Sequence, residues 1–217
     1  MSRVVKTSGA RKAEIMDAAE ALFVQKGFDR VPVQELLESV GIAKGTFYHH
    51  FASKEELLNA ILERTLEGIG ERAGAVAANP DMTGPAKLQA MLGVIFSTGG
   101  ERRGMTLDPD DDRHLVMHLK LTRLFYAKLE PALAAVTRQG IAEGVFRTGD
   151  PADVTAILLR GITGFIHLRF REMDDPGTAA RCMASVKLVL DRVLGMDGEP
   201  PQPQAAPAPT PNKEARP

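Results

Sequence analysis

The chain has 217 residues, of which 44% are apolar, and its formal net charge is −1. This length and composition allow one or two ordinary hydrophobic cores, and they exclude a chain that is unfolded along most of its length. The single cysteine, Cys182, excludes an internal disulfide and a thiolate metal cage, and the opening residues lack the apolar run of a signal peptide, so we expect a cytoplasmic protein. The most apolar segment, residues 154–170, is interrupted by Arg160, His167 and Arg169, and we therefore expect no membrane span.

Apolar residues recur at intervals of three and four along the chain, whereas alternating β-branched runs are nearly absent, so the sequence predicts an all-α fold. Gly27 and Gly41 each follow an apolar periodic segment, and they predict helix ends because glycine tolerates the left-handed backbone found there. Ser53, with Glu56 three residues later, predicts the start of a longer helix. The first 74 residues are thus expected to hold four helices, whose periodic segments lie at residues 15–23, 33–40, 44–51 and 57–69.

The rest of the chain predicts further helices and a tail. A breaker-rich segment, residues 77–87, separates the two parts, and Pro131 is expected to kink a long central helix because proline removes an amide donor. Pro151 suits the first turn of a later helix. Residues 197–217 are rich in Pro and Ala without an apolar face, and we expect them to form a disordered tail. The helices expected in this part span residues 85–96, about 111–143, 152–172 and 177–194, with a loop at 97–112.

A short helix, a glycine turn and a second short helix, between residues 33 and 51, form the helix-turn-helix arrangement that inserts its second helix into the DNA major groove. We expect Ile42, Phe47 and Phe51 to fix this unit to its neighbours. The polar residues then left to face phosphates and base edges are Lys44, Thr46, Tyr48, His49 and His50. The other interpretation is that Tyr48 and the histidines only cover apolar surface.

Residues 41–57, GIAKGTFYHHFASKEEL, resemble the DNA-binding signature of the TetR family of transcriptional regulators. That signature runs Gly, apolar, small, any, Gly, any, apolar, Tyr, any, His, Phe, and then a Ser-Lys that opens the fourth helix. The resemblance is strong over residues 11–60. It implies a dimer of all-helical subunits, with a DNA-binding domain at residues 1–52. It also implies a helical domain at 53–196 that binds an effector and dimerises, with the fourth helix as connector.

The resemblance also implies a set of DNA-binding residues. The three that open the recognition helix would approach bases or backbone, Tyr48, His50 and Lys54 would contact phosphates, and Gln34 would reach from the preceding helix. His49 occupies a variable position of the pattern. The full set is Gln34, Lys44, Gly45, Thr46, Tyr48, His49, His50 and Lys54.

Two positions depart from the family pattern. Ala43 stands where the family usually has Ser or Thr, and Pro32 stands where it has Thr. A hydroxyl at such a cap position satisfies an orphan amide, so Ala43 is expected to lose about 1 kcal/mol of capping. Pro32 can instead start the second helix, since its missing donor would have been an orphan. We therefore expect weaker caps with the same docking mode.

The central helix carries His114 and His118 at a spacing compatible with a metal ion. A metal-dependent hydrolase also needs a third ligand and a general base, and no Glu follows His114 in the zincin arrangement. We expect no catalytic site, no metal and no cofactor. The imidazoles belong instead either to a helix seam or surface, or to an effector pocket. A stripe of Met and Phe at helical spacing is more often plain core, but Met adapts to irregular ligands, which favours a pocket. The candidate pocket residues are Met91, Phe96, Met105, Met117, His118, Phe125, Tyr126 and Phe165.

The last two expected helices carry apolar stripes that need a partner. Gly161 and Gly164 are unfavourable inside a helix and indicate close helix approach. The resemblance identifies the partner as the same two helices of a second subunit, in a four-helix bundle. The stripe expected on the first of these helices is Val154, Ile157, Leu158, Gly161, Phe165 and Leu168.

These observations predict a dimeric transcriptional repressor that binds a palindromic DNA operator and is released by a small apolar or weakly acidic organic effector. The nearest alternative is an architectural DNA-binding protein or an activator that has no inducer. A more distant alternative is a metal-dependent hydrolase.

Overall fold

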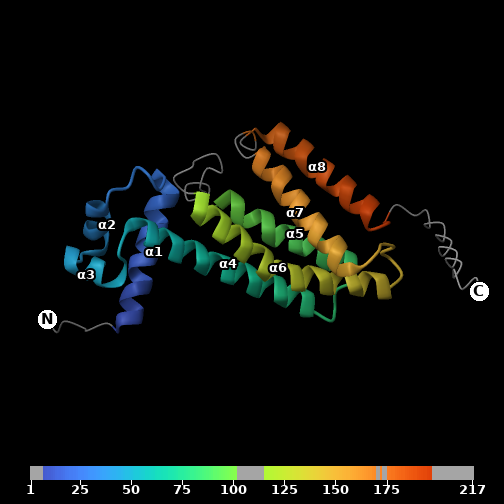
Figure 1. Cartoon of the computed structure of the whole chain (residues 1–217), viewed down its shortest axis with the longest axis horizontal. Helices are drawn as coiled ribbons and strands as arrows, with labels where there is room; N and C mark the ends of the chain where they lie inside the picture. Colours follow the sequence, from blue (N-terminus) through green and yellow to red (C-terminus); the bar gives the residue numbers. More distant parts are fainter. Residues whose placement is uncertain (1–6, 102–114, 170–171, 173–174, 197–217) are drawn as a thin grey trace, which may run out of the picture.

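The computed structural model describes residues 7–101, 115–169, 172 and 175–196, with only the backbone described for 96–101 and 167. Within these ranges the chain is helical and contains no strand, as predicted. The helices α1 to α3 form one end of the molecule, and α4 leads away from them beside α5 and α6 (Figure 1). The helices α7 and α8 lie on the side of α5 and α6 that faces away from α4. The helices are α1 (Ser8–Lys26), α2 (Val33–Val40), α3 (Lys44–His50), α4 (Lys54–Ala78), α5 (Gly84–Glu101), α6 (Leu115–Ala142), α7 (Pro151–Leu168) and α8 (Pro176–Val193).

The starts and stops of the first four helices follow local sequence signals. Gly27, after α1, has φ 85°, and Gly41, after α2, has φ 68°, so both adopt positive φ as their positions predicted. The hydroxyl of Ser53 accepts from the amide of Glu56 at 3.1 Å and caps α4. Neither Pro32 nor Ala43 makes a side-chain cap bond at the start of α2 or α3. Pro32 is itself the residue before α2, not its first helical residue.

The first core lies among α1, α2, α3 and the first half of α4. Phe47 and Phe51 are almost completely buried in it, which confirms that these rings fix the helix-turn-helix to its neighbours. Helix α4 contributes Leu57, Leu58 and Ile61 to this core. The expected domain boundary between residues 52 and 53 therefore runs through the first core. The buried members are Ile15, Met16, Ala19, Phe23, Phe28, Val31, Leu36, Leu37, Phe47, Phe51, Leu57, Leu58 and Ile61.

The second core lies among the second half of α4 and helices α5 to α8. Its buried members are Ile69, Ala73, Leu88, Met91, Leu129, Leu133, Val136, Phe146, Leu159, Val186, Leu190 and Leu194. Cys182, on α8, is buried too, as expected of a small apolar side chain. Among the helices that the structure describes, none combines the length and the apolar character needed to cross a membrane.

Two helix ends differ from expectation. Helix α5 continues to Glu101, although a loop was expected from residue 97. Ser97, Gly99 and Gly100 disfavour a helix, but unlike proline they do not prevent one. Helix α7 ends at Leu168 rather than 172. Residues 102–114 and 197–217, which include the start expected for the central helix and the tail, lie outside the described residues.

The apolar stripe expected on α7 is split between two faces of the helix. Val154, Leu158 and Phe165 pack against the second core, whereas Ile157 is 70% exposed and Leu168 is 85% exposed. The expected stripe mixed these two sets because both recur at helical spacing. The outward set, which we call the α7 outer face, is Ile157, Gly161, Gly164 and Leu168.

Candidate nucleic-acid interface

Helix α3 has a buried face and an exposed polar face. Phe47 turns inward, while Lys44, Gly45, Tyr48 and His49 are exposed and both Thr46 and His50 are partly exposed. The exposed ring of Tyr48 packs edge-on against Phe47, with 5.3 Å between the ring centroids, and Lys44 Nζ lies 5.9 Å from the centroid of Tyr48. The polar residues that were predicted to face outward thus all lie on α3 with exposed or partly exposed side chains, and Phe47 anchors this helix in the first core.

Position 45, near the start of α3, does not require glycine for any contact within the chain. Its φ is not in the left-handed region, and a Cβ added there would meet no heavy atom within 4 Å. Glycine inside a helix costs about 1 kcal/mol relative to alanine. Its presence on this face is consistent with the close approach of something outside the chain, which a bare backbone permits.

Gln34 lies exposed on α2, and its side-chain amide donates to Glu38 Oε1 at 2.8 Å. This bond holds the amide beside a carboxylate on the same helix. A base or phosphate contact by Gln34 would have to compete with that bond, so the predicted contact requires the side chain to turn away from Glu38.

Lys54, at the start of α4, is directed towards the loop before α2. Its ammonium donates to the carbonyl oxygens of Phe28 at 2.9 Å and Val31 at 3.0 Å, and it lies 4.3 Å from the centroid of the Phe28 ring. These contacts join α4 to the loop that positions the helix-turn-helix. The sequence did not predict this structural role, and the phosphate contact of Lys54 stays a prediction that would rely on its third N–H.

The beginning of α1 adds positive charge beside the end of α3. Lys12 Nζ lies 5.3 Å from the centroid of the Phe51 ring, and the rings of His49 and His50 are 5.1 Å apart. Burial lowers the pKa of His50 below its usual value of 6.5, and the positive fields of His49, Lys12 and Arg11 lower it further. The residue-by-residue prediction did not include Arg11 and Lys12, although the first twelve positions hold an excess of basic residues.

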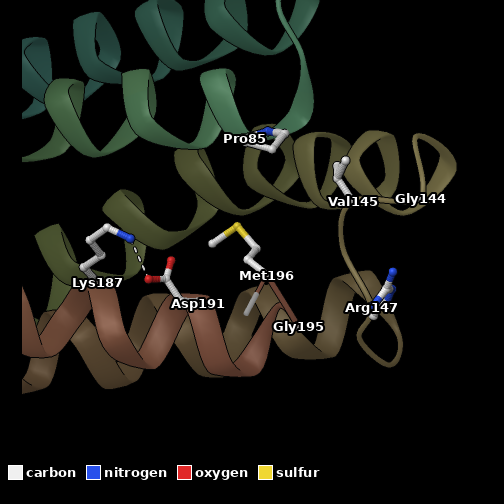
Figure 2. A pocket seen from close by; sticks show the side chains of 8 residues that line it. All are labelled: Pro85, Gly144, Val145, Arg147, Lys187, Asp191, Gly195 and Met196. Carbon is white, nitrogen blue, oxygen red and sulfur yellow. Dashed lines mark hydrogen bonds and ion pairs between the residues drawn. The ribbon is translucent and has the colours of Figure 1, made fainter. Parts of the chain in front are cut away.

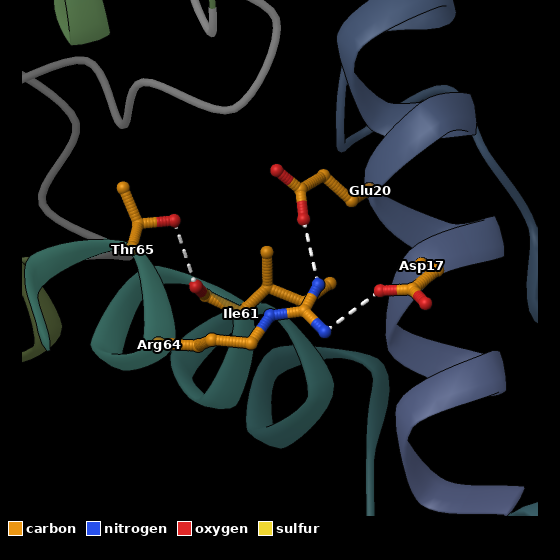
Figure 3. Close-up of polar contacts among 5 residues, drawn as sticks. All are labelled: Asp17, Glu20, Ile61, Arg64 and Thr65. Carbon is orange, nitrogen blue, oxygen red and sulfur yellow. Dashed lines mark hydrogen bonds and ion pairs between the residues drawn. The ribbon is translucent and has the colours of Figure 1, made fainter. Parts of the chain in front are cut away.

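Arg64, on α4, connects the nucleic-acid end of the molecule to the long connector helix. Its Nη1 donates to Asp17 Oδ1 and its Nη2 donates to Glu20 Oε2, both at 2.7 Å, so that one guanidinium joins two carboxylates of α1 (Figure 3). Burial alone would lower the pKa of Arg64, but the hydrogen bonds to Asp17 and Glu20 outweigh it and raise the pKa. The contact fixes the direction of α1 relative to α4.

Two ion pairs join α4 to α6 along the same side. Lys120 Nζ contacts Glu63 Oε1 and Lys128 Nζ contacts Glu67 Oε2, each at 2.6 Å. The hydrogen bond from Lys120 lowers the pKa of Glu63. Helix α4 is thus held by α1 at one end and by α6 over its middle, which makes it the mechanical link between the two cores.

The candidate effector residues that the structure describes lie in two different places, and their role in effector binding stays a prediction. Met91 is fully buried in the second core, and Phe125, Tyr126 and Phe165 pack against that core. Met117 instead packs against the first core, and His118 is half-buried on α6. The side chain of Phe96, all of Met105 and all of His114 lie outside the described residues. Within the described ranges, no three His, Cys, Asp or Glu side chains are grouped so that they could hold a metal ion.

A small cavity lies among α5, α6, α7 and α8. It encloses about 40 Å³, and none of the candidates whose side chains the structure describes lines it. The pattern of leucine and isoleucine that forms it could not be told from plain helix core in the sequence. The lining residues are Leu88, Leu92, Ile95, Leu133, Thr137, Thr155, Leu158, Leu159, Ile162, Leu190 and Leu194.

An open hollow of about 560 Å³ lies between the loop after α6 and the end of α8 (Figure 2). Lys187 and Asp191, which line it, form an ion pair at 2.5 Å. Arg147 provides its other cation, and Pro85 forms part of the opposite wall. The charged groups of α8 in this hollow are thus already paired with each other.

The chain is similar to known regulatory proteins. Residues 15–61 match the family model of bacterial regulatory proteins, tetR family. The chain is 28% identical over 194 residues to the HTH-type transcriptional repressor KstR2 of Rhodococcus jostii (strain RHA1). This alignment covers 87% of this chain and 92% of the relative. It is 29% identical over 199 residues to the HTH-type transcriptional repressor Rv1474c of Mycobacterium tuberculosis (strain ATCC 25618 / H37Rv), covering 91% and 88%. A solved transcriptional regulator from Cytophaga hutchinsonii ATCC 33406 shares the fold, with a TM-score of 0.71 at 18% identity over 83% of this chain and 96% of that one.

Proposed function

Because the chain belongs to the TetR family of transcriptional regulators, we propose that it is a dimeric repressor that binds a palindromic DNA operator and is released by a small organic effector. The observation that carries the proposal is the exposed face of α3, where Lys44, Gly45, Tyr48 and His49 stand above a fully packed core. The names of the relatives KstR2 and Rv1474c favour repression over activation.

The proposed DNA contacts divide into two kinds. Lys44, Gly45 and Thr46, at the start of α3, approach base edges in the major groove, where residues near the start of a recognition helix normally read sequence. Tyr48 and His50 contact phosphates. The basic residues at the start of α1 extend this phosphate contact, because Lys12 lies beside the end of α3.

The proposed dimer uses the α7 outer face together with the exposed side of α8. Ile157 and Leu168 leave large apolar side chains in solvent on α7, and Leu188, Val189 and Val193 do so on α8. A two-fold contact would bury this surface on both subunits at once. The two glycines of the α7 outer face would let the helix axes approach closely.

The proposed effector binds among the helices of residues 53–196, and the connector helix α4 transmits its effect. A ligand that moves α5 or α6 also moves α4, because α4 packs against both helices and is tied to α6 by ion pairs. Helix α4 in turn carries α1 through Arg64. A change in its direction would alter the distance between the two recognition helices of a dimer. We propose no catalytic residue, metal or cofactor, and we place the protein in the cytoplasm, where its DNA would be.

A gel-shift titration tests the DNA-binding proposal. The probe is a duplex selected by the wild-type protein from a random library, and the variants are Lys44→Ala, Thr46→Ala and Tyr48→Ala. Tyr48→Ala should weaken binding to every duplex, whereas Lys44→Ala and Thr46→Ala should also change the preferred sequence. Loss of one base contact should reduce the discrimination between the preferred base and the others by roughly 1–3 kcal/mol. Lys187→Ala, which removes a lysine from α8 far from α3, is the control. Wild-type binding by all three variants would refute the assignment.

Two further measurements separate the alternatives. An architectural protein or activator without an inducer would bind the duplex but would neither repress a reporter placed behind it nor be released by any compound in a broad screen. A metal-dependent hydrolase would instead carry metal after purification and would turn over an ester or phosphate substrate.

A further inference from the structure

We infer that the cavity among α5, α6, α7 and α8 binds a small, neutral, mainly aliphatic molecule through a hydroxyl that donates to Thr155. This inference deepens the effector part of the proposed function and rests on it for its regulatory meaning. It places the effector away from Phe125, Tyr126 and Phe165, which do not line the cavity.

The walls of the cavity are aliphatic except at one point. Of the eleven described residues that line it, nine are Leu or Ile, and the other two are Thr137 and Thr155. Both threonines are buried, with 6% and 4% of their surface exposed. Among the side chains that the structure describes, no charged or aromatic one lines the cavity. An apolar cavity of this kind is a poor site for water, because water needs two to four polar partners, and a good site for an apolar ligand.

The hydrogen bonds of the threonine pair leave one acceptor unused. Thr137 Oγ1 donates to the carbonyl of Leu133 at 3.0 Å and lies 3.2 Å from Thr155 Oγ1. A hydroxyl has a single proton, so both contacts are satisfied together only if Thr155 donates to Thr137. The lone pairs of Thr155 Oγ1 are then unspent in a buried site.

This arrangement selects the chemistry of the ligand. A ligand that donates a hydrogen bond gains a partner at Thr155, whereas a ligand that can only accept finds no free proton there. A carboxylate would be desolvated among leucines, with no compensating cation among the described lining residues, which is strongly unfavourable. The cavity therefore favours an alcohol over an acid of the same chain length, in contrast to the weakly acidic effector that the sequence left open.

The size and position of the cavity suit a short chain. A volume of about 40 Å³ holds a few water-sized groups, so a larger molecule must push the helices apart. Leu92, Ile95, Leu158 and Ile162 are partly exposed, so the cavity lies close to the surface along α5 and α7. Separation of α5 and α6 from α7 would act directly on the two helices that hold α4.

The test is a titration of the full chain, with labelled Leu and Ile methyl groups, against the 1-alkanols from 1-propanol to 1-hexanol, followed by NMR. Alkanols should shift the methyl signals of Leu92, Leu158 and Ile162 and leave that of Leu188, on the exposed side of α8, in place. The carboxylates of equal length should produce no such shift. If no alkanol shifts the lining methyl groups, or if the carboxylates bind equally well, the inference is overturned.

Matched variants test the threonine. Thr155→Val keeps the shape and removes the acceptor, so it should weaken alkanol binding roughly fivefold, the equivalent of one hydrogen bond. Binding of 1-chlorobutane, which cannot donate, should be unchanged. Thr155→Ser should restore alkanol binding, and Thr137→Val, which leaves the Thr155 hydroxyl in place, should retain it. Undiminished alkanol binding by Thr155→Val would overturn the inference. Operator binding without alkanol is measured separately, and its absence would defeat the proposed function while leaving the NMR result intact.

Discussion

Arg64, on α4, donates to Glu20, on α1, at 2.7 Å, although the two residues are 44 positions apart in the chain. The other arm of the same guanidinium holds Asp17, so the fork cannot be satisfied if α1 rotates on α4. The side chain of Arg64 is 39% exposed, and such pairs contribute at most about 1 kcal/mol to folding. The value of the contact therefore lies in orientation rather than in stability.

We predict that Arg64→Met weakens operator binding more than it lowers the free energy of unfolding, because the DNA-binding end then loses its fixed direction. Arg64→Lys, which keeps the charge without the fork, should behave similarly. The free energy of unfolding, measured by thermal denaturation, should fall by at most about 1 kcal/mol, while gel-shift titrations should show a clear loss of operator affinity. Lys187→Met removes a comparable surface ion pair at the far end and should alter neither measurement. Equal operator affinity of Arg64→Met and the wild type would contradict this role.

Gly45 gives a prediction in which two effects have opposite signs. Replacement by alanine should stabilise α3, by up to about 1 kcal/mol, because a Cβ improves helix propensity and meets no atom within the chain. The same methyl group should weaken operator binding if the backbone approaches DNA there. Thermal denaturation and gel-shift titration of Gly45→Ala measure the two effects. A variant that is more stable and binds DNA as well as the wild type would place Gly45 away from the interface.

The sequence predicted the helix-turn-helix well because its signals are local. Gly41 ends α2, Ser53 caps α4, and the burial of Phe47 follows from its spacing with the other apolar residues. Helical spacing could not predict which stripe of α7 faces the core, because Val154 and Ile157 fit apolar stripes equally well. That choice depends on where α6 and α8 lie.

The candidate effector site was less predictable for a related reason. Large flexible or aromatic residues such as Met91 and Phe125 fit the expectation of a pocket, but the side chain of Met91 is completely buried in the second core. The small cavity among α5, α6, α7 and α8 is lined mainly by leucine and isoleucine, whose helical spacing is that of any core. Close approaches are equally hidden: a Cβ at Gly140 would lie 2.1 Å from the ring of Phe146, a contact that no local pattern signals.

His50 gives a pH dependence whose sign differs between folding and DNA binding. Burial, His49, Lys12 and Arg11 hold its pKa below the usual value of 6.5 in the folded chain. The unfolded chain thus binds more protons, so the contribution of His50 to stability is present above pH 6.5 and is lost as the pH falls through the lowered pKa. Bound phosphates would raise this pKa, so operator binding takes up a proton and should strengthen over the same fall in pH.

Gel-shift titrations at fixed ionic strength between roughly pH 7.5 and pH 5.5 measure this linkage. The variant His50→Gln should flatten the pH dependence of operator binding. His49→Gln removes one of the positive neighbours, so it should retain the dependence and move it to higher pH. An affinity of the wild type that does not change over this range would show that His50 makes no phosphate contact.

The two glycines on the α7 outer face test the proposed dimer. A Cβ at Gly161 or Gly164 would meet no atom within 4 Å, so neither glycine is required by packing inside one subunit. We predict that Gly161→Leu leaves the helical circular dichroism signal unchanged. It should shift the sedimentation profile towards monomer, because a bulky side chain pushes the crossing helices apart.

Overpacking of this kind costs about 1–3 kcal/mol per site, and two-fold symmetry applies the cost twice in each dimer. A monomer cannot hold two half-sites together, so operator binding should weaken although α3 is intact. Gly161→Ala, which adds only one methyl group and improves helix propensity, is the matched control and should remain closer to the wild type. If the double variant Gly161→Leu, Gly164→Leu sediments as an unperturbed dimer, the two glycines lie away from the subunit contact.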